Sequence, residues 1–136
     1  MAFYRCGSGG GTPTETLLWE NPSPNATFAA QSVTLSDSIS NYDYIHFYFK
    51  SGASTNNIRS NIYSVADVKA STKSGARNNV CSTACSNTGS ASARSITYES
   101  DTQLAFSSAW SLGNAASYNQ TTIPLSIYGI KGNLLP

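Results

Sequence analysis

The sequence contains few charged residues. Only 11% of the 136 residues are Asp, Glu, Lys or Arg, whereas about 25% is usual in soluble domains. Eight basic and seven acidic residues leave a net charge of +1, so the chain lacks the basic surface that nucleic acids and anionic membranes attract. It also has no run of about 18 apolar residues that could cross a bilayer. We therefore expect no nucleic-acid partner and no insertion into a membrane.

Histidine and cysteine are also scarce. The chain has one histidine, His46, and three cysteines, Cys6, Cys81 and Cys85. A structural zinc site needs four ligands, and no second cysteine pair accompanies Cys81 and Cys85, so we expect no metal and no cofactor. In a strand these two would lie about 13 Å apart, beyond disulfide reach. The odd cysteine count and the lack of an apolar signal sequence favour reduced thiols and synthesis in a cytoplasm.

The residues that catalysis would need are not arranged for it. His46 lies within an aromatic strand pattern, and no serine occupies a Gly-x-Ser-x-Gly elbow. Glu99 and Asp101 are two positions apart and would share a strand face, whereas glycosidase carboxylates converge across a cleft. A solvated strand edge explains this pair more simply. We predict no catalytic residue and a protein that is not an enzyme; glycan cleavage by Glu99 or Asp101 is the opposing hypothesis.

The polar surface comes instead from Ser, Thr and Asn, which make up 48 of the 136 residues. Thr and Tyr favour strands, while Ser, Asn and Gly favour turns. The clearest strand covers residues 42–50, where Ile45, Phe47 and Phe49 share one face. Such segments recur between turn clusters, which predicts an all-β fold: an antiparallel sandwich or jelly roll of six to eight strands.

The chain length predicts a single domain, which we place at residues 15–131. Within it, Ile58 to Val68 is expected to be one strand, with Ile58, Ile62, Val65 and Val68 pointing inward. Residues 1–14 form a Gly-rich leader, expected to be flexible and to dock the domain on a neighbour. Residues 132–136 form a C-terminal tail, whose two leucines are expected to bury against a neighbouring subunit.

Aromatic side chains are the remaining functional signal. They could stack on sugar rings, but large aromatics also fill β-sandwich cores and subunit interfaces. The pattern therefore assigns no ligand-binding residue. The candidates are Tyr42, Tyr44, Tyr48, Tyr63, Tyr98, Trp110 and Tyr118.

Three segments follow one another in an order that is informative. They are Leu17–Pro24 with Phe28–Leu35, then Asn41–Ile45 before an amphipathic strand, and finally Ile123–Lys131. In this order they resemble the small β-domains of tail-fibre and related virion structural proteins of phages and prophages. The resemblance implies a β-sandwich module, often trimeric, that is displayed on a virion and commonly serves attachment to a host surface. It carries no catalytic residues over to this chain.

We therefore expect a virion structural protein, either a tail or head fibre or a decoration subunit, that is synthesised and assembled in the host cytoplasm. Its expected partners are other copies of itself, with a trimer favoured, and other virion proteins. A bacterial surface glycan is a further expected partner. The chain lacks the long shaft of a typical fibre, which favours a small separate subunit. The alternative is a carbohydrate-binding module or lectin-like domain of a bacterial protein.

Overall fold

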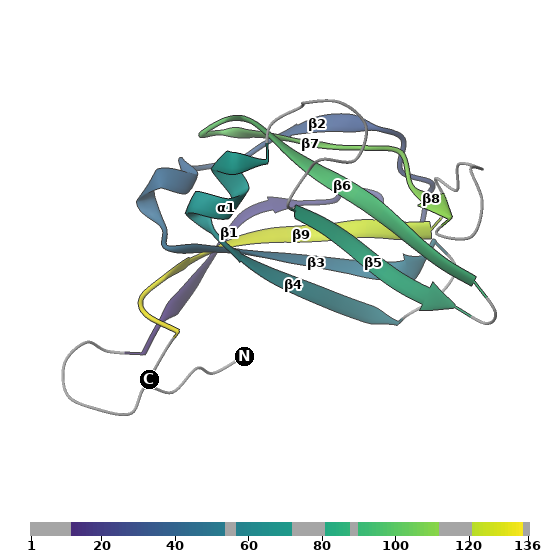
Figure 1. The fold of residues 1–136 in the computed structure, drawn as a ribbon, viewed down its shortest axis with the longest axis horizontal. Coiled ribbons are helices and arrows are strands. Elements are labelled where there is room, and N and C mark those ends of the chain that lie inside the picture. The colour runs from purple at the N-terminus through teal and green to yellow at the C-terminus, as the bar shows by residue number, and fades with distance from the viewer. Residues whose placement is uncertain (1–11, 54–56, 72–80, 88–89, 112–120, 135–136) are drawn as a thin grey trace.

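A computed structural model describes residues 12–53, 57–71, 81–87, 90–111 and 121–134. These residues form two antiparallel sheets with one short α-helix, which confirms the all-β prediction (Figure 1). The described residues contain nine strands, one more than the upper end of the expected six to eight. The first sheet has the order β1–β9–β3–β4, and the second has the order β2–β7–β6–β5, with β8 paired to β6.

The strand bounds show which segments meet across the chain. The first sheet consists of β1 (Thr14–Glu20), β9 (Thr121–Lys131), β3 (Tyr44–Gly52) and β4 (Ile58–Ser64). The second consists of β2 (Gln31–Thr34), β7 (Gln103–Phe106), β6 (Ser90–Ser100), β5 (Cys81–Asn87) and β8 (Trp110–Ser111).

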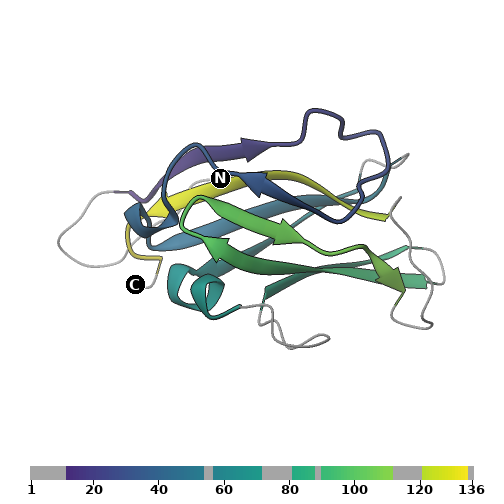
Figure 2. The same cartoon turned by 90° about the horizontal axis from the view of Figure 1, so that it is seen from above.

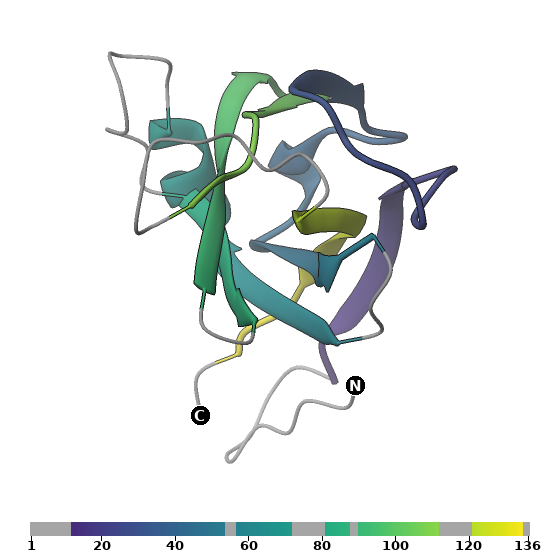
Figure 3. The ribbon, with the colours of Figure 1, turned by 90° about the vertical axis from the view of Figure 1, so that its right-hand side faces the viewer.

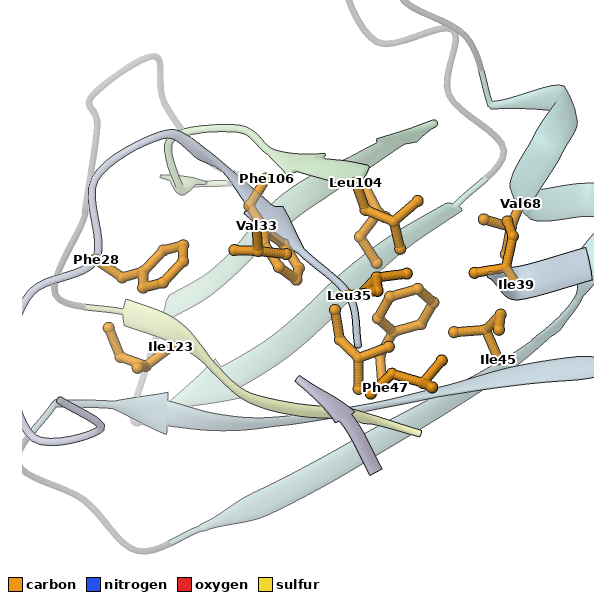
Figure 4. Close-up of a cluster of buried hydrophobic side chains, with 13 residues drawn as sticks. Phe28, Val33, Leu35, Ile39, Ile45, Phe47, Val68, Leu104, Phe106 and Ile123 are labelled. Atoms are coloured by element: carbon orange, nitrogen blue, oxygen red, sulfur yellow. The ribbon is translucent and has the colours of Figure 1, made fainter. Parts of the chain in front are cut away.

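Both sheets contribute to one apolar core. Ile45, Phe47 and Phe49 of β3 are at most 1% exposed, which confirms the predicted apolar face of that strand. Figure 4 shows Phe47 in a cluster with Leu104 and Phe106, which come from β7 of the second sheet. The strands of the two sheets are seen around this core in the end-on view of Figure 3. The remaining buried members of the cluster are Leu18, Phe28, Val33, Leu35, Ile39, Val68, Ile96, Ile123 and Ile127.

A β-bulge in β1 decides which residues enter the core. The pairing with β9 shifts between Leu17 and Trp19, so Leu18 is the extra residue. A bulge lets two successive side chains turn to one side; Leu18 is buried and Trp19 packs on the core. Leu17 is left on the opposite surface. The Leu18 carbonyl accepts a hydrogen bond of 2.9 Å from Ser36 N–H, just after β2, which joins the two sheets here.

The prediction of one strand from Ile58 to Val68 is correct up to Ser64, where β4 ends, and wrong beyond it. Helix α1 (Val65–Ala70) follows β4 directly. The Ser64 hydroxyl accepts a hydrogen bond from Asp67 N–H at 3.1 Å, as an N-cap does. Val68 is buried as expected, but from the helix. Helix α1 packs against β6, β4 and β3 at one end of the sheets (Figure 2). A second short element, the 3₁₀ helix η1 (Ile39–Asn41), precedes β3.

Ile58 and Ile62 do not point into the core as predicted; they are 58% and 37% exposed. Tyr63 explains this difference. Its ring packs edge-on against Phe47 at 6.2 Å, so Tyr63 takes the core face of β4. Alternate residues of a strand face opposite sides, and Ile62 is therefore directed outward.

A buried arginine links the sheets. Arg94 of β6 is completely buried. It donates hydrogen bonds to the carbonyls of Thr122 at 2.9 Å, Ser107 at 2.7 Å and Thr121 at 3.1 Å. Its guanidinium also lies 5.2 Å from the centre of the Phe28 ring. Burial lowers the pKa of Arg94 to about 10, which still leaves it charged at neutral pH.

The carbonyls that Arg94 holds belong to a strained piece of backbone. Thr122 has φ +47°, a left-handed conformation that is unfavourable for a β-branched residue. Its hydroxyl also shares a hydrogen bond of 2.6 Å with Ser92. Arg94 and Ser92 of the second sheet thus fix the start of β9 in the first sheet.

Some predictions fall outside the described residues. These include Cys6 with most of the Gly-rich leader, Tyr118, and Leu135 of the tail. Cys81 and Cys85 both belong to β5.

Candidate functional site

A row of side chains crosses the outer face of the first sheet, which is the face turned away from the core. Leu17 of β1 pairs with Tyr128 of β9, Tyr128 pairs with His46 of β3, and His46 pairs with Ile62 of β4. Paired residues of an antiparallel sheet lie on the same face. These four residues, called the outer row below, therefore span all four strands. Leu17 is 42% exposed and Ile62 is 37% exposed.

His46 is the buried centre of this row. It has no exposed surface, and its Nδ1 lies 2.5 Å from Oε1 of Glu15. An ionised carboxylate only accepts hydrogen bonds, so Nδ1 carries the proton. The Nε2 atom is buried and has no hydrogen-bond partner within the described ranges. His46 therefore binds β1 to β3 across β9, and this arrangement supports the prediction that it is a packing residue.

Two tyrosines complete the surface around His46. The Tyr48 ring lies 4.2 Å from the His46 ring, and it meets Tyr128 edge-on at 5.5 Å. Burial raises the pKa of Tyr48, and the negative charge of Glu15 and the Tyr128 phenol raise it further. The Tyr48 phenol is therefore protonated at neutral pH and can donate a hydrogen bond. The outer row thus exposes two apolar side chains, Leu17 and Ile62, on either side of the buried His46, with the protonated hydroxyl of Tyr48 beside it.

The aromatic candidates divide between this face and the core. Tyr44 and Tyr48 share the outer face of β3 with His46. Tyr63 packs in the core, and the hydroxyls of Tyr42 and Tyr98 donate to Asp37 at 2.9 Å and Asp101 at 2.6 Å. Trp110 begins β8. The interpretation of the sequence missed Tyr128, although strict alternation with Ile127 places it on the outer face.

Glu99 and Asp101 do not form the strand-face pair that was expected. The register of β6 against β7 shifts between Tyr98 and Ser100, and Asp101 lies in the turn after β6. The Ser32 hydroxyl donates to Glu99. Asp101 accepts hydrogen bonds from Tyr98 and from Ser40, the latter at 2.8 Å.

The pKa of Asp101 is lowered first by the Tyr98 hydroxyl and then by Ser40, with a smaller effect of Lys69. A carboxyl group that is held ionised in this way is a poor proton donor. The two acids thus have separate structural partners. Glu99 joins β6 to β2, whereas Asp101 joins the turn between β6 and β7 to η1 and α1.

No group of three or more His, Cys, Asp or Glu side chains suited to a metal ion occurs in the part of the chain that the structure describes. Within the described ranges, no helix is long and apolar enough to span a membrane. No protein-family model and no curated protein matches this sequence. Function must therefore be inferred from the surfaces themselves.

Proposed function

We propose that this chain is a structural subunit of a phage virion, a tail or head fibre or a decoration protein, whose two sheets form a β-sandwich. The observation that carries this proposal is the outer row. Two large apolar side chains of the row, Leu17 and Ile62, are exposed on this sheet face, and exposed apolar surface can mark a site of protein–protein contact. Association with further copies would cover Leu17 and Ile62, and the trimer that the resemblance implies is the assembly we favour.

The chemistry of the face suits contact between identical copies. Glu15 is already paired with His46, so the row brings no unpaired charge to an interface. Tyrosine is common at the centre of protein interfaces, because its ring is apolar and its hydroxyl can bond at the edge. The low overall charge also limits the repulsion between copies. Attachment of the virion to a bacterial surface glycan is the activity that such a subunit would support.

The area of the face predicts how strongly the copies associate. The outer row crosses four strands about 4.8 Å apart, so it is about 19 Å long, and a single row of side chains about 7 Å wide covers roughly 130 Å². A stable interface buries about 800 Å² on each partner. The outer row alone therefore gives a weak contact that dissociates on dilution. Assembly on a particle would supply the missing contacts through multivalency.

Light scattering during size-exclusion chromatography tests the assembly. We expect a mass near three times 14.4 kDa, about 43 kDa, at about 100 µM and a lower mass on dilution, as a contact of this size implies. Ile62→Ser should shift the protein to a monomer. Ile58→Ser is the matched control, because Ile58 is an exposed isoleucine on the same strand outside the row. A wild-type monomer at all concentrations would refute assembly through this face.

The second candidate function is a carbohydrate-binding module of a bacterial protein. Tyr48 and Tyr128 favour it, since neutral phenol rings on an exposed sheet face can stack on sugars. A monomer that binds glycans through this face, with binding lost in Tyr48→Ala, would support this function instead of virion assembly.

A further inference from the structure

A cleft of about 480 Å³ lies between strand β2 and the loop that follows β1. Its apolar part is formed by Trp19, Pro22, Phe28 and Val33. Its polar part includes Thr27, Gln31 and Ser32. No charged residue lines the cleft. The volume lies within the range of about 300–1,000 Å³ that is usual for small-molecule sites.

The open edge of β2 forms one wall of this cleft. Among the strands that the structure describes, β2 pairs only with β7. Leu35 N–H donates to Thr102 on the β7 side, and Ser36 N–H donates to Leu18 on the opposite side. Main-chain groups alternate in direction along a strand, so those of Ser32 and Thr34 point the same way as those of Ser36. The wall therefore presents N–H donors and C=O acceptors in alternation.

The indole of Trp19 forms the facing surface and is held in place. Its ring meets Phe28 edge-on at 6.1 Å and Phe106 at 6.0 Å. It is only half buried, and its N–H has no hydrogen-bond partner among the residues that the structure describes. The cleft thus combines a fixed aromatic ring with hydrogen-bonding groups of both kinds.

This combination selects a class of ligand. The lining contains no Lys or Arg, so it offers nothing to hold a phosphate or a carboxylate. The nearby acid, Glu99, already accepts a hydrogen bond from Ser32. A sugar has an apolar ring face for an aromatic side chain and hydroxyls that both donate and accept. A neutral saccharide matches this lining.

We propose that the cleft binds a neutral saccharide unit, with the ring of the sugar against Trp19 and its hydroxyls on the edge of β2. The inference rests on the proposed function for its biological meaning, because it gives glycan attachment a site. The cleft does not include the outer row. Saccharide binding and assembly can therefore fail independently of one another.

Amide NMR of the ¹⁵N-labelled full chain tests the site. The probes are methyl α-D-glucopyranoside, methyl β-D-galactopyranoside and N-acetyl-D-glucosamine, each added to about 50 mM, since ligands of about a dozen heavy atoms commonly bind with millimolar dissociation constants. We expect at least one probe to give saturable shifts of the Trp19 indole N–H and of the Ser32 and Thr34 amides. Trp19→Phe assigns the indole signal and should weaken binding at least fivefold.

Two glutamines provide a matched comparison that does not disturb the core. Gln31→Ala removes an exposed side chain that lines the cleft and should weaken binding about threefold, the loss of roughly one hydrogen bond. Gln103→Ala removes an exposed side chain on the adjacent strand β7, outside the cleft, and should leave the dissociation constant unchanged. Equal effects of the two variants would overturn the assignment.

Two other results would also overturn it. The first is the absence of saturable shifts in the cleft with all three probes. The second is a response to an extended peptide, acetyl-Thr-Val-Thr-Val-amide, without a response to any sugar, which would identify the edge of β2 as a site for strand addition. Light scattering on the same samples separates the two proposals. An intact oligomer that binds no sugar would refute the saccharide site and leave the proposed assembly standing.

Discussion

Replacement of Arg94 by methionine tests whether one buried cation holds the two sheets together. Methionine has a similar length and no charge, so it fills most of the space. It cannot donate to the three carbonyls that Arg94 now binds, at Thr121, Thr122 and Ser107. Buried ions can often be replaced by apolar side chains with a gain in stability. We expect no such gain here, because the replacement would leave three buried carbonyls without a hydrogen-bond donor.

The structure gives the magnitude of the effect. Hydrogen bonds from a charged donor contribute about 1.5–3 kcal/mol each, so three of them amount to about 5–9 kcal/mol. Burial opposes this: the lowering of the pKa of Arg94 to about 10 corresponds to a cost of about 3 kcal/mol for the charged form. The net loss expected for Arg94→Met is therefore about 2–6 kcal/mol, a large part of the stability of an ordinary domain.

Urea unfolding followed by tryptophan fluorescence measures this loss. Arg94→Lys keeps the charge and one donor group, and it should lie between the wild type and Arg94→Met. This variant also gives a readable result if Arg94→Met fails to fold. An Arg94→Met protein as stable as the wild type, or more stable, would refute the reasoning and would show that desolvation outweighs the three hydrogen bonds.

Two further predictions concern the end of the sheets that carries η1 and α1. A Cβ on Gly129 would lie 2.5 Å from the Tyr42 ring, and the hydrogen bond of that ring to Asp37 limits its retreat; Gly129→Ala should therefore cost about 1–3 kcal/mol in urea unfolding, and no measurable loss would contradict the packing. The pKa of Asp101 lies below its ordinary 3.8, so its contribution to stability is present above that pH and is lost as the pH falls through the lowered value. Asp101→Asn should be less stable at neutral pH and should lose less stability from about pH 5 to about pH 2; thermal melts across this range would show an unchanged pH profile if the carboxylate has no such role.

Alternation in the sequence was enough to predict the central strands. Residues 42–50 contain apolar side chains at every second position, and β3 places Ile45, Phe47 and Phe49 in the core as that pattern predicts. The final strand was expected from Ile123, and β9 begins only two residues earlier. These strands are flanked on both sides within their sheet, so burial enforces the period of two.

The errors occur where a single hydrogen bond or a bulge changes the direction of the chain. In the sequence, Ser64 looks like one more polar position of a strand. In the structure, its hydroxyl accepts a hydrogen bond from Asp67 N–H and caps the start of α1. Ile62 is apolar, but the larger ring of Tyr63 takes the core face. Arg94 lies between Ala93 and Ser95, and only its parity with buried Ile96 indicates that it points inward.

The candidate sites were only partly visible in the sequence. The aromatic members of β3 were identified as possible contacts, whereas the outer row depends on the register of four strands that are distant in sequence. The cleft is built from residues 19–34 alone, so it is local. Its signal was a tryptophan shortly before a polar loop with prolines, but the segment Leu17–Pro24 was used only for the resemblance and Trp19 was not among the aromatic candidates.

Thr14 and Lys131 are the first pair of residues between β1 and β9, so the β-domain is entered and left at one corner. A fusion partner joined at either side would emerge from that same corner. The Trp19 cleft lies about 17 Å further along β1, at the usual rise of a strand, and would stay accessible to solvent. The domain could therefore be inserted into a surface loop of a carrier protein and still present its binding cleft outward.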